Sequence, residues 1–167
     1  VENADDWDKP ATRGQLAAHR ALLRRNPAAI ALVDAGLTKR DFQFPDVRGR
    51  DPHRYFIEAG SFLNLRLPKQ IQTRIAVAEH RWADAVRATL EDLALGQMLI
   101  RGNRFEIDFL IAIVAEGCAL AAIRQLARTP DLPGAEIEIL AHAIQSRPSH
   151  ERAFADAIRG DFACCFA

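Results

Sequence analysis

The chain has 167 residues, and 49% of them are hydrophobic, which is enough for one folded domain with its own core and argues against disorder. Its 22 Lys and Arg side chains balance 22 Asp and Glu side chains, so the net charge at pH 7 is zero. This balance argues against binding to nucleic acid through a basic surface and against attachment to an anionic membrane.

Helical periodicity recurs along the chain, whereas no segment alternates polar and apolar residues as a strand does. After an irregular acidic start at 1–10 we expect helices at 11–25 and 27–36, the second with Asn26 as its N-cap and Pro27 in its first turn. Residues 37–54 have no helical period and contain two prolines. They are predicted to form the longest loop.

Six further helices are predicted, separated by proline, glycine or short polar turns. They are expected at about 53–65, 68–80, 82–100, 104–128, 133–145 and 149–162. Short turns make consecutive helices antiparallel neighbours. The predicted fold class is therefore all-α, a single domain over 1–167 in which about eight helices stack as antiparallel hairpins.

The last predicted helix carries a narrow apolar stripe. Phe154, Ile158 and Phe162 follow at intervals of four residues, so we expect this face to dock onto the core. The charged residues of the helix are expected to stay in water: Arg152, Asp156 and Arg159. For the apolar end at 162–166 we prefer packing on the core, the alternatives being a groove cover or a contact with another subunit.

Glu116 is the most unusual residue, because it interrupts the otherwise apolar helix expected at 104–128. On a helical wheel it lines up with apolar side chains that include Phe109 and Ile113. An unpaired carboxylate there is costly, so we expect Glu116 to pair with an arginine of a neighbouring helix and to fix helix register. Two arginines are considered for this role, Arg81 and Arg152.

The alternative is that Glu116 lines a pocket with Phe109 and Ile113. There it would orient a cationic or hydroxylated ligand, or act as the general acid or base of a hydrolase or lyase. The adjacent Gly117 would then allow close approach of a ligand or backbone. If the chain is an interaction module, Glu116 should be buried and paired, and an exposed concave groove should lie beside it. If the chain is a ligand-binding domain, a cavity of roughly 300 Å³ or more should reach Glu116.

The predicted loop at 37–54 holds a second candidate binding site. Together with His53, the arginines Arg48, Arg50 and Arg54 would suit a phosphate group or an acidic peptide. Three aspartates lie in the same segment, so a solvated and internally paired loop is the preferred interpretation.

Motifs of common catalytic and cofactor sites are missing from the sequence. There is no glycine-rich phosphate loop, HExxH, CxxC or GxSxG, and the five histidines lie on separate predicted elements. The three cysteines, Cys118, Cys164 and Cys165, lack metal-ligand spacing and are expected to be reduced. We therefore expect no cofactor, no metal and no catalytic residue.

One predicted hairpin resembles a known motif. In AVAEHRWADAVRATLEDLAL, the residues Ala76, Ala78, Trp82, Ala85 and Val86 are similar to those where the two helices of a tetratricopeptide repeat meet. The resemblance covers one repeat of about 34 residues, and no second copy follows at that period. The whole chain also resembles uncharacterised bacterial helical proteins with degenerate repeats, some of which carry a membrane anchor ahead of the domain.

This resemblance implies a stacked, superhelical arrangement and a module that binds or scaffolds proteins without catalysis. The expected partner is a protein, with a second copy of the chain as one candidate and with no nucleic acid. The apolar run at 109–123 is shorter than the roughly 20 residues that span a bilayer, so no transmembrane segment is expected. The compartment stays open between the cytoplasm and the soluble part of a membrane-anchored protein.

Overall fold

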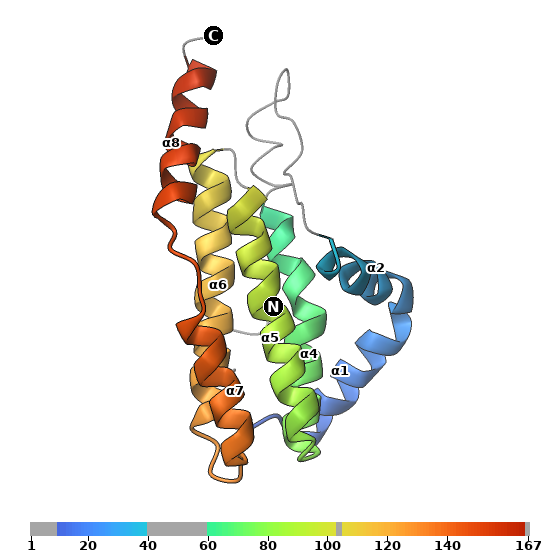
Figure 1. Ribbon diagram of the computed structural model, residues 1–167. Helices are drawn as coiled ribbons and strands as arrows, with labels where there is room; N and C mark the ends of the chain where they lie inside the picture. The colour runs from blue at the N-terminus through green and yellow to red at the C-terminus, as the bar shows by residue number, and fades with distance from the viewer. Residues whose placement is uncertain (1–9, 40–59, 103–104, 166–167) are drawn as a thin grey trace.

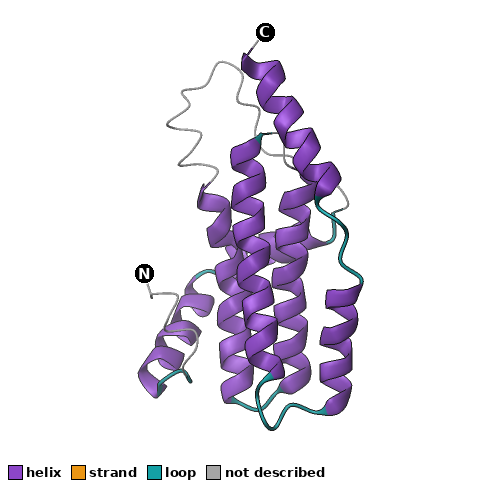
Figure 2. Cartoon of the chain, turned by 90° about the vertical axis from the view of Figure 1, so that its left-hand side faces the viewer, coloured by secondary structure: helices purple, strands orange, loops and turns teal. Residues whose placement is uncertain are grey.

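The structure is a computed structural model that describes residues 10–39, 60–102 and 105–165. Over these residues the chain is all-helical, with seven α-helices, one short 3₁₀ helix and no strand (Figure 1, Figure 2). In chain order they are α1 (Arg13–Arg25), α2 (Pro27–Leu37), the 3₁₀ helix η2 (Phe62–Arg66), α4 (Leu67–Ala78), α5 (Trp82–Gly102), α6 (Glu106–Ala127), α7 (Gly134–Gln145) and α8 (Glu151–Cys165). The predicted all-α class is confirmed for this part of the chain.

Some predicted elements fall outside the described residues. These are almost all of the irregular start at 1–10, most of the loop at 37–54 and the first part of the helix predicted at 53–65. The end of that predicted helix is described: residues 60 and 61 are α-helical, and the 3₁₀ helix η2 follows them and leads directly into α4. The count of about eight helices stays a prediction.

The helix ends follow local chemistry that the sequence displays. Thr12 and Gln15 form a capping box at the start of α1, in which each side chain accepts a hydrogen bond from the other residue's backbone N–H. Pro27 stands in the first turn of α2, as predicted. Asn26 precedes it but makes no side-chain cap, because its amide donates to the carbonyl of Leu22 in α1 instead.

Three consecutive antiparallel helices form the body of the molecule (Figure 1). α5 is the central one, with α4 packed on one side and α6 on the other. α7 and α8 follow one another along the outer side of this body, and α8 packs on α6. α1 and α2 lie at the opposite side, next to α4 and α5.

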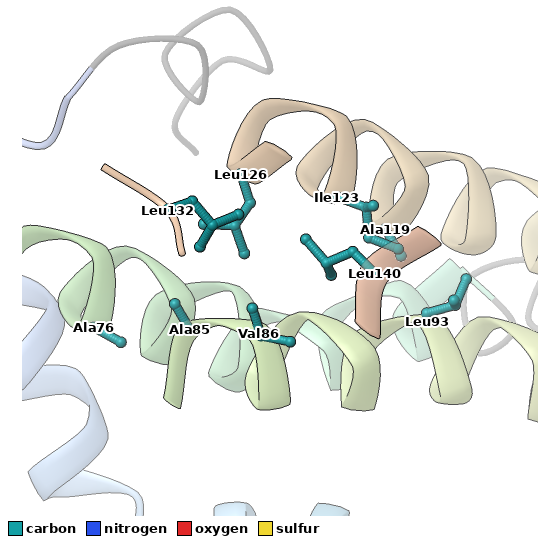
Figure 3. Close-up of a cluster of buried hydrophobic side chains, with 9 residues drawn as sticks. All are labelled: Ala76, Ala85, Val86, Leu93, Ala119, Ile123, Leu126, Leu132 and Leu140. Atoms are coloured by element: carbon teal, nitrogen blue, oxygen red, sulfur yellow. The ribbon is translucent and has the colours of Figure 1, made fainter. Parts of the chain in front are cut away.

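The largest apolar cluster lies where α4, α5, α6 and α7 meet. Figure 3 shows its buried members: Ala76, Ala85, Val86, Leu93, Ala119, Ile123, Leu126, Leu132 and Leu140. Three of the nine are alanines, which lets the helix backbones approach closely, while the valine, the leucines and the isoleucine fill the remaining space. This cluster is the apolar core of the lower part of the body in Figure 1.

The predicted core helix at 104–128 is α6, which has 22 residues and is covered by α5, α7 and α8. Two acids are buried along it: Asp108 is 0% exposed and Glu116 is 2% exposed. None of the helices in the described part of the chain combines the length and the apolar character needed to cross a bilayer.

α8 does not dock through its large apolar stripe, so that prediction is wrong. Ala157 is fully buried against α6, whereas the three large side chains are strongly exposed: Phe154 47%, Ile158 36% and Phe162 64%. Phe154 keeps one contact with the core, where its ring centroid lies 5.3 Å from that of Phe109. Because Ala157 is small, α8 lies close to α6 at this contact. The large apolar side chains of α8 then lie at the edge of the contact and not within it.

Candidate functional site

The buried carboxylate of Glu116 is held by two side chains from the connector between α7 and α8. Arg147 donates from Nε to Oε1 and from a terminal nitrogen to Oε2, both at 3.0 Å. The Nε2 atom of His150 lies 2.6 Å from Oε2. An arginine therefore pairs with Glu116, but it is neither Arg81, which pairs with Glu79 and Asp84, nor Arg152, whose side chain is 94% exposed.

The position of this cluster follows from the interruption between α7 and α8, the two helices along the outer side of the body. The connector lies between α7 and α8, and it contains Pro148, which cannot continue a helix. It passes the middle of α6 (Figure 1), where Glu116 is located. Arg147 and His150 flank the break and both reach this one carboxylate. Neither residue was predicted as a partner of Glu116: Arg147 lies between two predicted helices, and His150 was assigned to the start of the last predicted helix.

The close helix contact at this level is made by Gly96, not by Gly117. A Cβ placed on Gly96 of α5 would lie 2.9 Å from both the Cα and the backbone nitrogen of Glu116. Gly117 is exposed, and nothing lies within 4 Å of the position a Cβ would take there. The predicted role of Gly117 is therefore wrong, because this glycine is on the solvent side of α6.

Phe109 and Ile113 contribute to an apolar cluster of the core. Phe109 is buried in an apolar cluster with Leu99 and Ile100, and Ile113 packs partly buried against the same cluster. Neither of the two clefts described below is lined by these residues or by Glu116. The three arginines of the predicted basic site lie outside the described residues: Arg48, Arg50 and Arg54.

The chemistry open to the Glu116 cluster is limited by its burial and its pairing. Both carboxylate oxygens already accept hydrogen bonds, and the Nδ1 atom of His150 is buried without a partner among the described residues. Within that same part of the chain, no group of three His, Cys, Asp or Glu residues is arranged to hold a metal ion. The cluster ties the connector to α6.

A cleft of about 570 Å³ lies between helices α1 and α2 on one side and the α4–α5 hairpin on the other. Its apolar surface comes from Leu23, Leu37, Ile75, Ala76 and Ala88. Its polar surface comes from Asp34, Thr38, Lys69, Gln72, Arg81, Asp84, Arg87 and Glu91. The volume is in the range of sites that hold a small molecule or a few side chains of a partner.

Lys69 is the most buried charged residue of this cleft, with its side chain only 4% exposed. Its ammonium lies 2.5 Å from Asp34 of α2 and 2.6 Å from Glu91 of α5. Burial alone would lower the pKa of Lys69, but hydrogen bonds and charge attraction from the two carboxylates together raise that pKa above 10.5. Lys69 thus ties α2 to the body with its charge fully paired.

A second set of ion pairs lies at the rim of this cleft, near the turn between α4 and α5. Arg20 of α1 lies 2.5 Å from Glu79, which also accepts a hydrogen bond from Arg81 at 2.9 Å. Arg81 and Arg87 both pair with Asp84. Hydrogen bonds from Arg20 and Arg81 lower the pKa of Glu79, and the hydrogen bond from Arg81 lowers the pKa of Asp84. These three arginines and two carboxylates carry a net charge of +1, which is offset by the net charge of −1 on Lys69 with Asp34 and Glu91.

A second cleft of about 500 Å³ adjoins the first across α5. Leu37, Arg87 and Glu91 line both clefts. The remaining lining residues of the second cleft are Ala83, Val86, Leu90, Ala94, Glu136 and Ile139, which extends the surface to α7. The two clefts together form one groove, which we call the α5 groove, running from α1 and α4 over α5 to α7.

A buried ion pair beside the α5 groove was also missed by the sequence analysis. Arg66 donates from Nε and from a terminal nitrogen to the two carboxylate oxygens of Asp92, at 2.7 and 2.5 Å. Burial raises the pKa of Asp92 above its ordinary value, although Arg66 opposes that effect. The pair joins η2 to α5 in the interior, where leaving either charge alone would be costly.

Comparisons of the chain with protein-family models, with curated proteins and with solved structures found no match. The resemblance to tetratricopeptide repeats therefore stays a prediction.

Proposed function

We propose that this protein is an interaction module that binds a peptide segment of another protein in the α5 groove, without catalysis. The observation that carries the proposal is the pair of adjoining clefts, about 570 and 500 Å³, in which apolar side chains are bordered by ion-paired charges. Such a surface favours a segment that inserts apolar side chains and keeps its own polar groups at the rim.

The shape of the α5 groove favours a peptide over a compact metabolite. Two connected depressions suit successive anchor side chains of one segment, as in a groove that receives an amphipathic helix. The paired charges at the rim, such as Arg87 with Asp84, offer hydrogen bonds without an excess of one sign. A ligand site or catalytic site at Glu116 has less support, because Arg147 and His150 occupy its oxygens.

We further propose that α4 and α5 form a hairpin of the tetratricopeptide type. Ala76 and Ala85 are buried where the two helices meet, and Trp82 packs against the same cluster, which supports the resemblance. Ala78 is exposed and takes no part in this contact, so the likeness is incomplete at that position.

The test begins with peptides selected from a random display library against the folded protein. Their affinity is then measured by fluorescence anisotropy for the wild type and for Gln72→Trp, which places an indole in the first cleft. We expect at least tenfold weaker binding. Gln145→Trp adds the same group at an exposed position of α7 outside both clefts, and it should bind like the wild type.

A charge reversal gives a second, matched test. Arg87 is 68% exposed and pairs with Asp84 three residues earlier, and Arg159 of α8 is 75% exposed and pairs with Asp156 in the same way. Arg87→Glu should weaken binding of the selected peptides, whereas Arg159→Glu should not. Equal affinity for the wild type, Gln72→Trp and Arg87→Glu would show that the α5 groove is not the binding site.

A further inference from the structure

One part of the first cleft presents carboxylates to the solvent. Lys69 binds Asp34 and Glu91, so these three side chains carry a net charge of −1. The Lys69 side chain is only 4% exposed, whereas those of Asp34 and Glu91 are 51% and 34% exposed. A ligand that enters the cleft here therefore meets carboxylate oxygens, because the ammonium is buried.

These two carboxylates retain capacity for a second cation. A carboxylate offers about four acceptor positions, and Lys69 contacts one oxygen of each. Because Asp34 of α2 and Glu91 of α5 bind the same nitrogen, they are close neighbours, and one ligand cation can contact both. Leu37 and Ile75 line the same cleft and offer apolar surface to the aliphatic stem of a lysine or arginine. This part of the cleft therefore suits a basic side chain.

The opposite charge is exposed one helical turn away. Arg87 precedes Glu91 by four residues on α5, which is about 6 Å along the helix axis. The side chain of Arg87 is 68% exposed, compared with 32% for Asp84, its ion-pair partner. Arg87 donates to Asp84 from one terminal nitrogen, so other donors of its guanidinium remain for a ligand. This part of the cleft therefore suits an acidic side chain.

The spacing of these two charges matches that of a helix. Arg87 and Glu91 line both clefts, so their charges lie along the middle of the α5 groove. An α-helix places residues four positions apart on one face, separated by about 6 Å along its axis. A helical segment with one basic and one acidic residue four positions apart can therefore pair with Glu91 and Arg87 at the same time.

We propose that the partner of the α5 groove is a helical segment of this kind, with its basic residue at Asp34 and Glu91 and its acidic residue at Arg87. This inference rests on the proposed function, because it specifies the peptide that the groove receives. A surface ion pair changes an affinity by about fivefold at most. The charges therefore determine which segment binds more than how tightly it binds.

The test uses the display-selected peptides whose binding Gln72→Trp weakens, since these peptides occupy the α5 groove. They should contain a basic and an acidic residue four positions apart. Replacing either residue by glutamine should weaken binding to the wild type by about threefold to fivefold, as measured by fluorescence anisotropy. Selected peptides without such a pair, or with unchanged affinity after both replacements, overturn the inference.

Double-mutant cycles identify which charges meet. Loss of the basic residue from the peptide should matter less to Glu91→Gln than to the wild type, and loss of the acidic residue should matter less to Arg87→Gln. Glu151→Gln and Arg159→Gln alter exposed charges of α8 outside both clefts, and they should respond to both peptide changes as the wild type does. Equal losses for the wild type, Glu91→Gln and Arg87→Gln would show that these charges are not the contacts.

Failure of this inference is distinguishable from failure of the proposed function. If Gln72→Trp binds every selected peptide like the wild type, the α5 groove is not the binding site and both proposals are wrong. If Gln72→Trp weakens binding and the charge replacements have no effect, the groove remains the site and only the charge pattern is wrong. Circular dichroism establishes that each variant is folded, and the cycle at the exposed Arg87 decides the matter if Glu91→Gln does not fold.

Discussion

The backbone of Glu116 on α6 lies directly against Gly96 on α5, with no room for a methyl group between them. The buried acid is therefore fixed from two sides, by a backbone contact with α5 and by side-chain contacts with the α7–α8 connector. Each of these contacts can be altered separately, because Gly96 makes no part of the ion pair.

Gly96→Ala should destabilise the protein by about 1–3 kcal/mol, because the new Cβ would overlap the backbone of α6 and force the helices apart. Gly117→Ala is the control, because this glycine lies on the solvent side of the neighbouring helix α6. It meets nothing within 4 Å and should stabilise by about 0.5–1 kcal/mol through helix propensity. Urea denaturation followed by circular dichroism measures both. Equal effects of the two substitutions would contradict the tight contact at Gly96.

Glu116→Gln keeps the size of the side chain but removes the charge that Arg147 pairs with. We expect a loss of about 2 kcal/mol in the free energy of unfolding, less than for a fully buried pair because the Arg147 side chain is 26% exposed. Arg147→Met removes the other partner, and the double variant should lose less than the sum of the two single losses. Urea denaturation of all four proteins gives this coupling, and purely additive losses would mean that the pair contributes nothing.

The Lys69 interaction should appear as a pH dependence at the alkaline end. Because its pKa is raised above 10.5 in the folded protein, its stabilising effect is complete below that pH and is lost as the pH rises through the raised pKa. The wild type should therefore lose stability more steeply than Lys69→Met between about pH 10 and pH 12. Lys39→Met, at an exposed position, should follow the wild type. Parallel curves for the wild type and Lys69→Met would rule out the raised pKa.

Arg66→Met should be severely destabilising, by about 3–5 kcal/mol at pH 7, because it leaves the carboxylate of Asp92 buried without its cation. Burial already raises the pKa of Asp92, so the folded variant should take up a proton more readily than the unfolded chain. Its deficit relative to the wild type should shrink as the pH falls from 7 toward 4. Denaturation curves at several pH values measure this, and a deficit that is constant or grows in acid would contradict it.

Local patterns in the sequence were sufficient for the helices and for one feature of the candidate site. Capping residues, prolines and apolar spacing act within a few residues of each other, so the all-helical fold and most helix ends could be predicted. The need of Glu116 for a cationic partner could also be predicted, because the cost of a buried unpaired carboxylate does not depend on which partner relieves it.

The identity of that partner was decided by tertiary packing. Arg147 is 31 residues from Glu116 and lies in a connector, so only the course of α7 and α8 along α6 brings the two together. The same holds for Gly96 facing Glu116 and for the α5 groove, whose walls come from α1, α2, α4, α5 and α7. The exposure of the α8 stripe has the same origin, because periodicity defines an apolar face, whereas the rotation of the docked helix about its axis determines whether that face meets the core or the solvent.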